Sequence, residues 1–298
     1  MKLNIGYFAD GPWSHETFNK LINDNEIKIS FICAKYSTKD KTLENYSKIH
    51  KIDYYKHKNV NSNEFVSILK KYNCDLFVSM SFDQIFKSSI INLPKFKTIN
   101  CHAGKLPFYR GRSILNWALI NDEKEFGITV HYVDEGIDTG DIILQKCFQI
   151  SDQDNYKTLL LRAHNECANI LYEAILLFKK GSAKSFKQTK IHPKGFYCSR
   201  ILKGDEIINW NQTSREIFNF VRAFCFPGLI AGSFINKKEM KINKVELINT
   251  SVSKNYIAGT IINKSLDSFT VKTKDNCLKV TDFNYDGMLK VGDRFDIK

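Results

Sequence analysis

The first half of the chain alternates two patterns of apolar residues. Short, continuous apolar runs, which are typical of buried strands, cover residues 3–8, 27–33, 75–80 and 98–102. Stretches with apolar residues at helical spacing, which predict helices, cover residues 14–25 and 63–72. Strands that alternate with helices in this way favour a parallel sheet with helices on its faces. Ligands gather at the carboxyl ends of the strands in such a sheet.

A second set of patterns follows the strand at residues 98–102. The predicted elements are a short helix over residues 113–121, strands over 127–133 and 141–150 joined by a loop over 134–140, and a long helix over 155–180. The composition then becomes polar over residues 181–200, where Pro193 and Gly195 interrupt any regular pattern. This stretch therefore reads as a connector between two parts of the chain.

The last third of the chain has a helical pattern over residues 213–224 and then only short β-like runs. These runs are separated by turns rich in Lys, Asn and Gly, and they cover residues 241–247, 257–262, 268–272 and 277–283. This pattern suggests a small antiparallel barrel or sheet. We therefore predict an α/β chain with a Rossmann-like, mostly parallel sheet in residues 1–185, a connector over 186–205 and a smaller β-rich domain over 206–298.

Composition and charge narrow the class of protein. The 298 residues are 43% hydrophobic, which is ordinary for a globular protein with a sizeable core. The formal net charge of +12 invites a nucleic-acid partner, but it comes mostly from scattered lysines, and arginine occurs only seven times. Solvated lysines explain the charge better than a binding face does. No apolar run is long enough to span a bilayer and no signal-peptide pattern is present, so we expect a cytoplasmic protein without a membrane partner.

Eight cysteines are present, and no two of them form a CxxC pair. Most lie in apolar contexts, so we predict reduced, buried thiols and no bound metal. Cys101 stands between Asn100 and His102. Side chains alternate between the two faces of a strand, so Cys101 points away from its polar neighbours and is a poor candidate for a nucleophile.

Asn100, His102 and Asp138 are the candidate catalytic residues. Asp138 follows His102 by 36 residues, in the predicted loop 134–140. An amide can steady an oxyanion, an imidazole can move protons, and a carboxylate can orient the imidazole or tune its basicity. These three groups suffice for acyl transfer when the attacking amine belongs to the substrate. The first hypothesis is therefore an N-acyl or N-formyl transferase. A second histidine, His131, lies in an alternating strand and is interpreted as structural.

The residues around this trio carry a family resemblance. The chain reads NCHAGKLPFYRGR at residues 100–112, GITVH at 127–131 and DTGD at 138–141. Over residues 1 to about 150 it resembles the formyltransferases that use 10-formyltetrahydrofolate, and the likeness continues more loosely toward the C-terminus. The resemblance implies an OB-like C-terminal domain and the catalytic trio Asn100, His102 and Asp138. It also implies that folate is held by Phe82, Gln84, Ile85, Phe86, Leu106, Pro107, Asp134, Glu135, Gly136 and Asp141.

The acceptor amine is the remaining question. The run RGRSILNW at residues 110–117 looks like the version found in enzymes that formylate nucleotide-linked amino sugars, although Ile114 stands where many relatives have proline. The resemblance makes a dTDP- or UDP-linked amino-dideoxy sugar, used for lipopolysaccharide or O-antigen synthesis, the leading acceptor. The substrate-binding candidates are Trp13, Ser14, Lys105, Arg110, Arg112, Asn116 and Arg200.

Two other functions compete with this one. A methionyl-tRNA formyltransferase would use the basic C-terminal domain to hold tRNA. The loop over residues 35–44 is short and has no arginine, which argues against a dedicated tRNA-gripping insertion. A folate- or nucleotide-binding module without catalysis is the third reading, and the complete trio argues against it. We expect a homodimer that binds folate and a nucleotide sugar and no nucleic acid.

Overall fold

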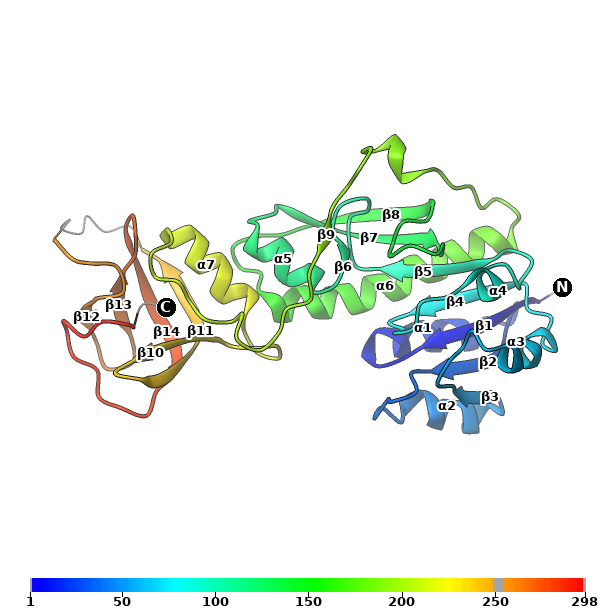
Figure 1. Ribbon diagram of the computed structural model, residues 1–298, viewed down its shortest axis with the longest axis horizontal. Coiled ribbons are helices and arrows are strands. Elements are labelled where there is room, and N and C mark those ends of the chain that lie inside the picture. The colour runs from blue at the N-terminus through cyan, green and yellow to red at the C-terminus, as the bar shows by residue number, and fades with distance from the viewer. Residues whose placement is uncertain (1, 249–254, 297–298) are drawn as a thin grey trace. The chain divides into compact units, whose positions relative to one another are not determined.

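The computed structural model describes residues 2–248 and 255–296, and its residues fall into two units. The first unit comprises Met1–Gly111, Phe126–Phe148 and Leu161–Cys198, and the second comprises Arg112–Glu125, Gln149–Leu160 and Ser199–Lys298. Residues 249–254, 297 and 298 of the predicted C-terminal domain lie outside the described residues. Figure 1 labels the elements of both units.

A seven-stranded sheet forms the centre of the first unit (Figure 1). In spatial order its strands are β3 (Asp53–Lys56), β2 (Ile27–Ala34), β1 (Leu3–Ala9), β4 (Leu76–Met80), β5 (Thr98–His102), β7 (Glu125–Tyr132) and β8 (Ile142–Gln149). The first five strands pair in parallel, and β7 pairs antiparallel with β5. The predicted α/β class with a mostly parallel N-terminal sheet is confirmed.

Helices cover this sheet, and aromatic residues fill the space between one face of the sheet and its helices. The helices are α1 (Pro12–Ile22), α2 (Thr42–His50), α3 (Asn63–Lys70), α4 (Ser88–Ile91) and α6 (Tyr156–Lys179), whose residues from Leu161 onward belong to the first unit. The Phe8 ring lies at the centre of the aromatic cluster, with its centroid 5.5 Å from that of Phe31 and 5.3 Å from that of Phe77. Both contacts are edge-to-face, the arrangement that aromatic rings favour.

Several short elements of this unit were not predicted from the sequence, among them α2 and β3. Helix α2 buries only Leu43 and Ser47, and none of the four residues of β3 is buried. Such elements lack the continuous apolar pattern that reveals the central strands. Helix α1 begins two residues earlier than predicted, because Pro12 is tolerated in the first turn, where its missing N–H costs nothing.

The second unit contains a five-stranded antiparallel sheet and two helices. The strands in spatial order are β10 (Ala231–Ile235), β11 (Lys238–Leu247), β14 (Cys277–Asn284), β13 (Phe269–Lys272) and β12 (Ile261–Lys264), and the helices are α5 (Ile114–Ile120) and α7 (Ser214–Ala223). The predicted antiparallel β domain is confirmed. The strand predicted over residues 257–262 begins only at Ile261, because Gly259 has a φ of 85° and breaks the extended run.

A short two-stranded ribbon completes the first unit. It pairs β6 (Arg110–Gly111), which follows the strand of His102, in parallel with β9 (Tyr197–Cys198) of the connector. The connector also contains a 3₁₀ turn, η1 (Gln188–Lys190). The polar connector predicted from composition is therefore attached to the loop that follows His102.

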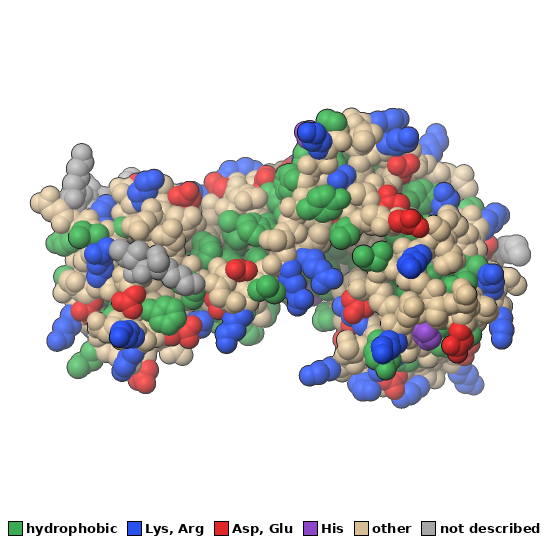
Figure 2. All heavy atoms as spheres, in the orientation of Figure 1, with side chains coloured by type: hydrophobic (Ala, Val, Ile, Leu, Met, Phe, Trp, Pro, Cys, Tyr) green, Lys and Arg blue, Asp and Glu red, His purple; other side chains and the backbone are tan. Residues whose placement is uncertain are grey.

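The surface agrees with a scattered distribution of charge. In the view of Figure 2, Lys and Arg side chains are spread over the visible faces of both units, with Asp and Glu among them. Among residues 2–248 and 255–296, no helix is both long enough and apolar enough to cross a membrane.

Candidate active site

Strand β5 presents Asn100 and His102 on the same face. It pairs antiparallel with β7, so that Asn100 stands opposite His131 and His102 stands opposite Thr129. Cys101 points the other way, and its Sγ donates to the carbonyl of Cys167 in α6 over 3.7 Å. The alternation of the strand therefore separates the thiol from the polar pair, as the sequence predicted.

The His102 ring is held at both nitrogens. Its Nε2 lies 2.7 Å from the carbonyl oxygen of Tyr109, and its Nδ1 lies 3.5 Å from Oδ2 of Asp138. A carbonyl oxygen can only accept, so Nε2 carries a proton in this arrangement. The proton that His102 can gain or release is then the one on Nδ1, which faces the carboxylate.

Gly104 is the residue that permits the bond between His102 and Tyr109. A Cβ atom built on Gly104 would lie 2.5 Å from His102 Nε2 and 2.5 Å from the Tyr109 carbonyl oxygen. Any larger residue would push one of these two partners aside. The steric demands of the site therefore explain why a glycine stands at position 104.

Asp138 lies at the centre of the polar groups. Its Oδ2 accepts the backbone N–H of Gly111 at 2.9 Å, and its Oδ1 lies 3.5 Å from Nε2 of His131. Burial opposes ionisation of this carboxyl, but the nearby imidazoles of His102 and His131 and the Gly111 N–H outweigh it and hold the pKa of Asp138 well below its usual range. Asp138 is therefore a carboxylate at neutral pH and can stabilise a protonated imidazole beside it.

His131 belongs to this group, although the sequence analysis assigned it a structural role. Its Nδ1 donates to the carbonyl of Tyr132 at 2.7 Å, and its Nε2 lies 3.3 Å from Nδ2 of Asn100. The ring is almost fully buried. The sequence pattern could not identify a partner for His131. Its position opposite Asn100 depends on the pairing of β7 with β5, which is a long-range contact.

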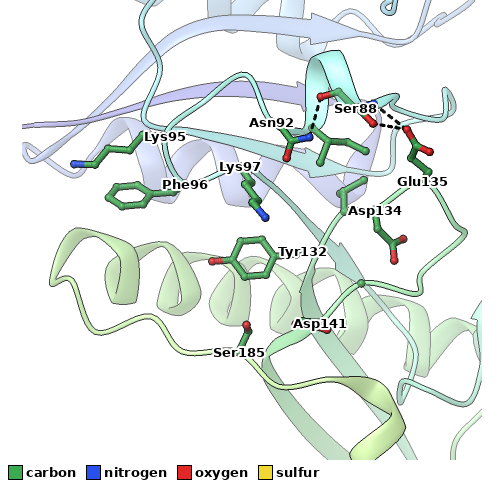
Figure 3. A pocket seen from close by; sticks show the side chains of 13 residues that line it. Ser88, Asn92, Lys95, Phe96, Lys97, Tyr132, Asp134, Glu135, Asp141 and Ser185 are labelled. Carbon is green, nitrogen blue, oxygen red and sulfur yellow. Dashed lines mark hydrogen bonds between the residues drawn. The ribbon is translucent and has the colours of Figure 1, made fainter. Parts of the chain in front are cut away.

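Three of the predicted folate residues line a cleft of about 550 Å³ in the first unit. These are Asp134, Glu135 and Asp141, and Figure 3 shows them with side chains from the segment between Ser88 and Lys97. Ser88 donates to Glu135 from its backbone N–H and its hydroxyl, which ties the two sides of the cleft together. The carboxylate of Asp134 accepts from the Gly136 N–H at 3.1 Å and closes the loop on itself.

The predicted folate segment at residues 82–86 lies elsewhere in the first unit. Phe86 is buried, with its ring 4.9 Å from that of Phe8, and Phe82 packs on the same aromatic cluster. The Gln84 amide donates to the His57 carbonyl at 2.8 Å and accepts from the Val60 N–H. Among the described residues that line the cleft of Figure 3, none comes from residues 82–86. Within that segment, Ile85 is an exposed apolar residue.

Leu106 and Pro107 lie in the loop after His102, close to residues that hold the loop in place. Leu106 is buried, and its carbonyl accepts the side-chain amide of Gln145 at 2.9 Å. The carbonyl of Pro107 accepts the N–H of Phe196 in the connector. These contacts explain why the loop is fixed, and the predicted folate contacts of both residues stay predictions.

Arg110, predicted to bind the substrate, donates hydrogen bonds within the protein. Its guanidinium is buried and donates to Oε1 of Gln188 from Nε at 3.1 Å and from Nη2 at 2.6 Å. Its Nη1 donates to the carbonyl of Lys194 at 3.1 Å. The guanidinium is thus directed at protein groups, and its predicted contact with the substrate stays a prediction.

Two other substrate candidates of the first unit also bond within the protein. The buried Ser14 donates its hydroxyl to the Gly11 carbonyl at 2.7 Å. The ring of Trp13 meets that of His164 edge-on, with centroids 4.3 Å apart. Lys105 is half-buried in the loop after His102.

The remaining substrate candidates belong to the second unit. Asn116 donates its amide to the Ala223 carbonyl at 2.7 Å, which links α5 to α7. Arg112 and Arg200 are exposed at their places in this unit. These two arginines therefore remain available to a ligand.

Comparison with known proteins gives two family matches along the chain. The family described as formyl transferase matches residues 18–175, and the family described as formyl transferase, C-terminal domain, matches residues 200–290. The methionyl-tRNA formyltransferase of Fusobacterium nucleatum is 33% identical over 287 residues, which cover 94% of this chain and 91% of that protein. The methionyl-tRNA formyltransferase of Thermodesulfovibrio yellowstonii is 36% identical over 216 residues, which cover 72% and 67%.

Solved structures share the fold over nearly the whole chain. WlaRD, a sugar 3N-formyl transferase solved with dTDP and 5-N-formyl-THF, superposes with a TM-score of 0.68 at 24% identity and covers 97% of this chain and 100% of its own. An N-formyltransferase from Helicobacter canadensis, solved with folinic acid and dTDP-3-aminofucose, superposes with a TM-score of 0.67 at 23% identity, covering 95% and 100%. At these identities the likeness shows the fold alone.

Proposed function

The chain belongs to the formyl transferase family, and we propose that it formylates the amine of a dTDP- or UDP-linked amino-dideoxy sugar. It is an N-formyltransferase, and its formyl donor is 10-formyltetrahydrofolate. The formylated sugar then enters the synthesis of a surface glycan.

The chemistry of transfer follows from the arrangement around Asp138. The folate supplies an activated formyl group, and the acceptor supplies an amine that attacks only when it is unprotonated. His102 takes up the proton that the amine loses, at the Nδ1 atom that faces Asp138. The carboxylate of Asp138 stabilises the imidazolium that results. Asn100 offers amide hydrogens to the oxygen on which negative charge develops. When this intermediate collapses, the bond between the formyl carbon and N10 of the folate breaks, and His102 returns its proton to N10, so that tetrahydrofolate leaves.

The cleft of Figure 3 supports folate binding in the first unit. Its volume of about 550 Å³ lies within the range usual for small-molecule sites. The carboxylates of Asp134, Glu135 and Asp141 suit the amino and N–H groups of a pterin, which donate hydrogen bonds. This cleft would hold part of the folate, and the reacting formyl group lies beyond it, because Asn100, His102 and Asp138 are not among its lining residues.

The connection between β2 and α2 is the observation that favours a small acceptor over tRNA. It spans only residues 35–41, and its Asp40 pairs with His15 of α1 at 3.1 Å. Lys35 lies 3.8 Å from the carboxylate of Asp10, and Lys41 lies 3.1 Å from that of Glu44. Binding to a polyanion depends on cations that are free to neutralise phosphates. A short segment in which two of the three lysines face carboxylates supplies little of that charge.

Formylation of methionyl-tRNA is the second candidate function. The relatives from Fusobacterium nucleatum and Thermodesulfovibrio yellowstonii, at 33% and 36% identity, carry that name. The net charge of +12 would also suit a polyanionic partner. This candidate makes a different prediction for the assay below.

One experiment separates the two acceptors. The protein is incubated with 10-formyltetrahydrofolate and, in parallel, with charged initiator tRNA and with dTDP- and UDP-linked sugars that carry a 3-amino or a 4-amino group. We expect the added formyl mass on one nucleotide sugar and none on the methionyl-tRNA. Formyl-methionyl-tRNA as the product would overturn the proposed acceptor and leave the family assignment intact. The predicted homodimer is tested on the same sample by sedimentation equilibrium.

A further inference from the structure

We propose that Gln188 and Arg110 form a clamp that sets the distance between Asp138 and His102. The inference rests on the proposed roles of His102 and Asp138 in formyl transfer. The clamp consists of one side-chain amide and one guanidinium, both buried in the first unit. Neither residue belongs to the candidate trio, so both are positioning residues.

Burial of Gln188 is the first observation. Its neighbours in the connector, Lys187 and Thr189, are exposed, whereas Gln188 is only 3% exposed. A primary amide loses its bonds to water when it is buried, and this is costly unless protein groups replace them. A glutamine at this place in a polar stretch therefore has partners that account for its burial.

The amide nitrogen of Gln188 holds the loop of Asp138. Its Nε2 donates to the carbonyl of Asp138 and to the carbonyl of Gly140, each at 2.8 Å. The backbone of Asp138 has a φ of 54°, in the left-handed region that costs energy for a residue with a Cβ atom. Two hydrogen bonds from one rigid amide on either side of Thr139 keep the loop in this conformation.

The amide oxygen of Gln188 holds Arg110. Oε1 accepts from both Nε and Nη2 of the guanidinium, and Nη1 is fixed by the carbonyl of Lys194. Together the two side chains use both amide hydrogens of Gln188 and the amide oxygen. A buried polar pair that is satisfied in this way is rigid.

The sequence neighbours of Arg110 make this contact relevant to catalysis. Tyr109 supplies the carbonyl that accepts from His102 Nε2, and Gly111 supplies the N–H that donates to Asp138 Oδ2. The backbone on either side of Arg110 therefore touches both members of the imidazole–carboxylate pair. Gln188 joins that backbone to the Asp138 loop, so its amide fixes the two groups relative to each other.

Gln188→Glu separates the two halves of the clamp. A glutamate keeps an acceptor for Arg110, so the guanidinium remains paired. It has no N–H for the carbonyls of Asp138 and Gly140, so the loop of Asp138 is released. A displacement of about 1 Å at a catalytic group costs on the order of 100-fold in rate. We expect kcat to fall about 100-fold. The KM for folate should rise with it, because Gly140, which Gln188 holds, also lines the cleft of Figure 3, whereas the KM for the acceptor should change less than about twofold.

Asn4→Asp is the matched control in the same unit. The Asn4 amide also donates to two backbone carbonyls, those of Tyr72 at 2.8 Å and Asn73 at 3.3 Å, at the start of β1. This variant removes the same kind of bond outside the candidate site. It should lower the melting temperature and leave kcat within about twofold of the natural protein. An equal fall of kcat in Asn4→Asp and Gln188→Glu would show a general loss of stability and overturn the clamp.

A second measurement does not depend on the acceptor. In Gln188→Met, which adds no charge, the ring proton signals of His102 are followed by NMR as the pH is changed, and His102→Asn identifies them. Release of Asp138 weakens the stabilisation of the protonated ring, so protonation should shift to lower pH. An unchanged titration in a folded Gln188→Met protein would overturn the clamp. Turnover by His102→Ala would instead refute the catalytic role of His102. That result would contradict the proposed function, whereas the titration of the Gln188→Met protein tests the clamp alone.

Discussion

The Nε2 atom of His102 lies 2.7 Å from the carbonyl oxygen of Tyr109, seven residues further along the chain. The carbonyl fixes which nitrogen of the ring bears the permanent proton, and it turns Nδ1 toward Asp138 at 3.5 Å. In the proposed mechanism this arrangement directs proton transfer to the side of the ring that faces the carboxylate.

His102→Ala should abolish formyl transfer while the protein stays folded. In the proposed mechanism the ring takes the proton of the attacking amine, and a positioned proton-transfer group contributes about 100-fold to 10,000-fold in rate. Single-turnover transfer from 10-formyltetrahydrofolate measures the loss, and circular dichroism checks the fold. Near-normal turnover in the folded variant would remove His102 from the mechanism.

Asp138→Asn should lower kcat and move the acid limb of the pH–rate profile. The carboxylate stabilises the protonated imidazole, so without it the ring gains a proton only at lower pH. The acid limb should therefore shift to lower pH. A profile measured from pH 5 to 9 that keeps its shape would place Asp138 outside the proton-transfer step.

The same carboxylate should make stability depend on pH. The pKa of Asp138 is lower in the folded protein than in the unfolded chain, so the folded state gains stability above the ordinary aspartate pKa of about 4. That gain is lost as the pH falls from about 4 toward the folded value. The difference in unfolding free energy between the natural protein and Asp138→Asn should thus be largest near neutral pH and shrink below about pH 4. Urea titrations at pH 7 and pH 3 measure it, and a constant difference would contradict the assignment.

Gly104→Ala should impair catalysis more than folding. The added Cβ would lie 2.5 Å from both His102 Nε2 and the Tyr109 carbonyl oxygen, so the bond between them cannot survive unchanged. We expect kcat to fall on the order of 100-fold, as for a catalytic group displaced by about 1 Å. Gly232→Ala is the control, because its new Cβ would meet only the flexible ends of side chains, the nearest at 3.2 Å. Equal kinetics for the two variants would refute the steric argument.

Arg112→Lys should raise the KM for the nucleotide sugar about tenfold, which corresponds to about 1.4 kcal/mol of binding. Arg112 is exposed, and it directly follows Gly111, whose N–H contacts Asp138. A guanidinium can bind two diphosphate oxygens at once, and lysine keeps the charge but loses that fork. The KM for folate should stay unchanged, and Arg294→Lys, a conservative change at another exposed arginine, should alter neither constant. A rise in the folate KM alone would place Arg112 on the other ligand.

The sequence predicted the fold best in those segments where the apolar residues of the local pattern are the ones that the fold buries. Strand β5 was predicted with its observed bounds, because Ile99 and Cys101 are buried beside the polar pair. The long helix α6 and the antiparallel C-terminal sheet were found for the same reason. Helix α2 and strand β3 were missed because they bury few apolar side chains.

The candidate site was less accessible to sequence reasoning, because its partners are distant along the chain. Arg110 looked like a phosphate ligand, and only the fold brings Gln188 against its guanidinium. His131 looked structural until its register opposite Asn100 was known. Residues that bond across such separations leave no periodic trace in the sequence.

The pairing of β6 with β9 has a consequence for how this enzyme can be divided or recombined. A fragment that ends at residue 185 would retain every strand of the seven-stranded sheet. It would lack Gln188, the Lys194 carbonyl and the β9 strand, so the segment between His102 and Gly111 would lose its outer support. The smallest transplantable catalytic module therefore extends to Cys198, and chimaeras joined before that residue should be inert even when their sheet is intact.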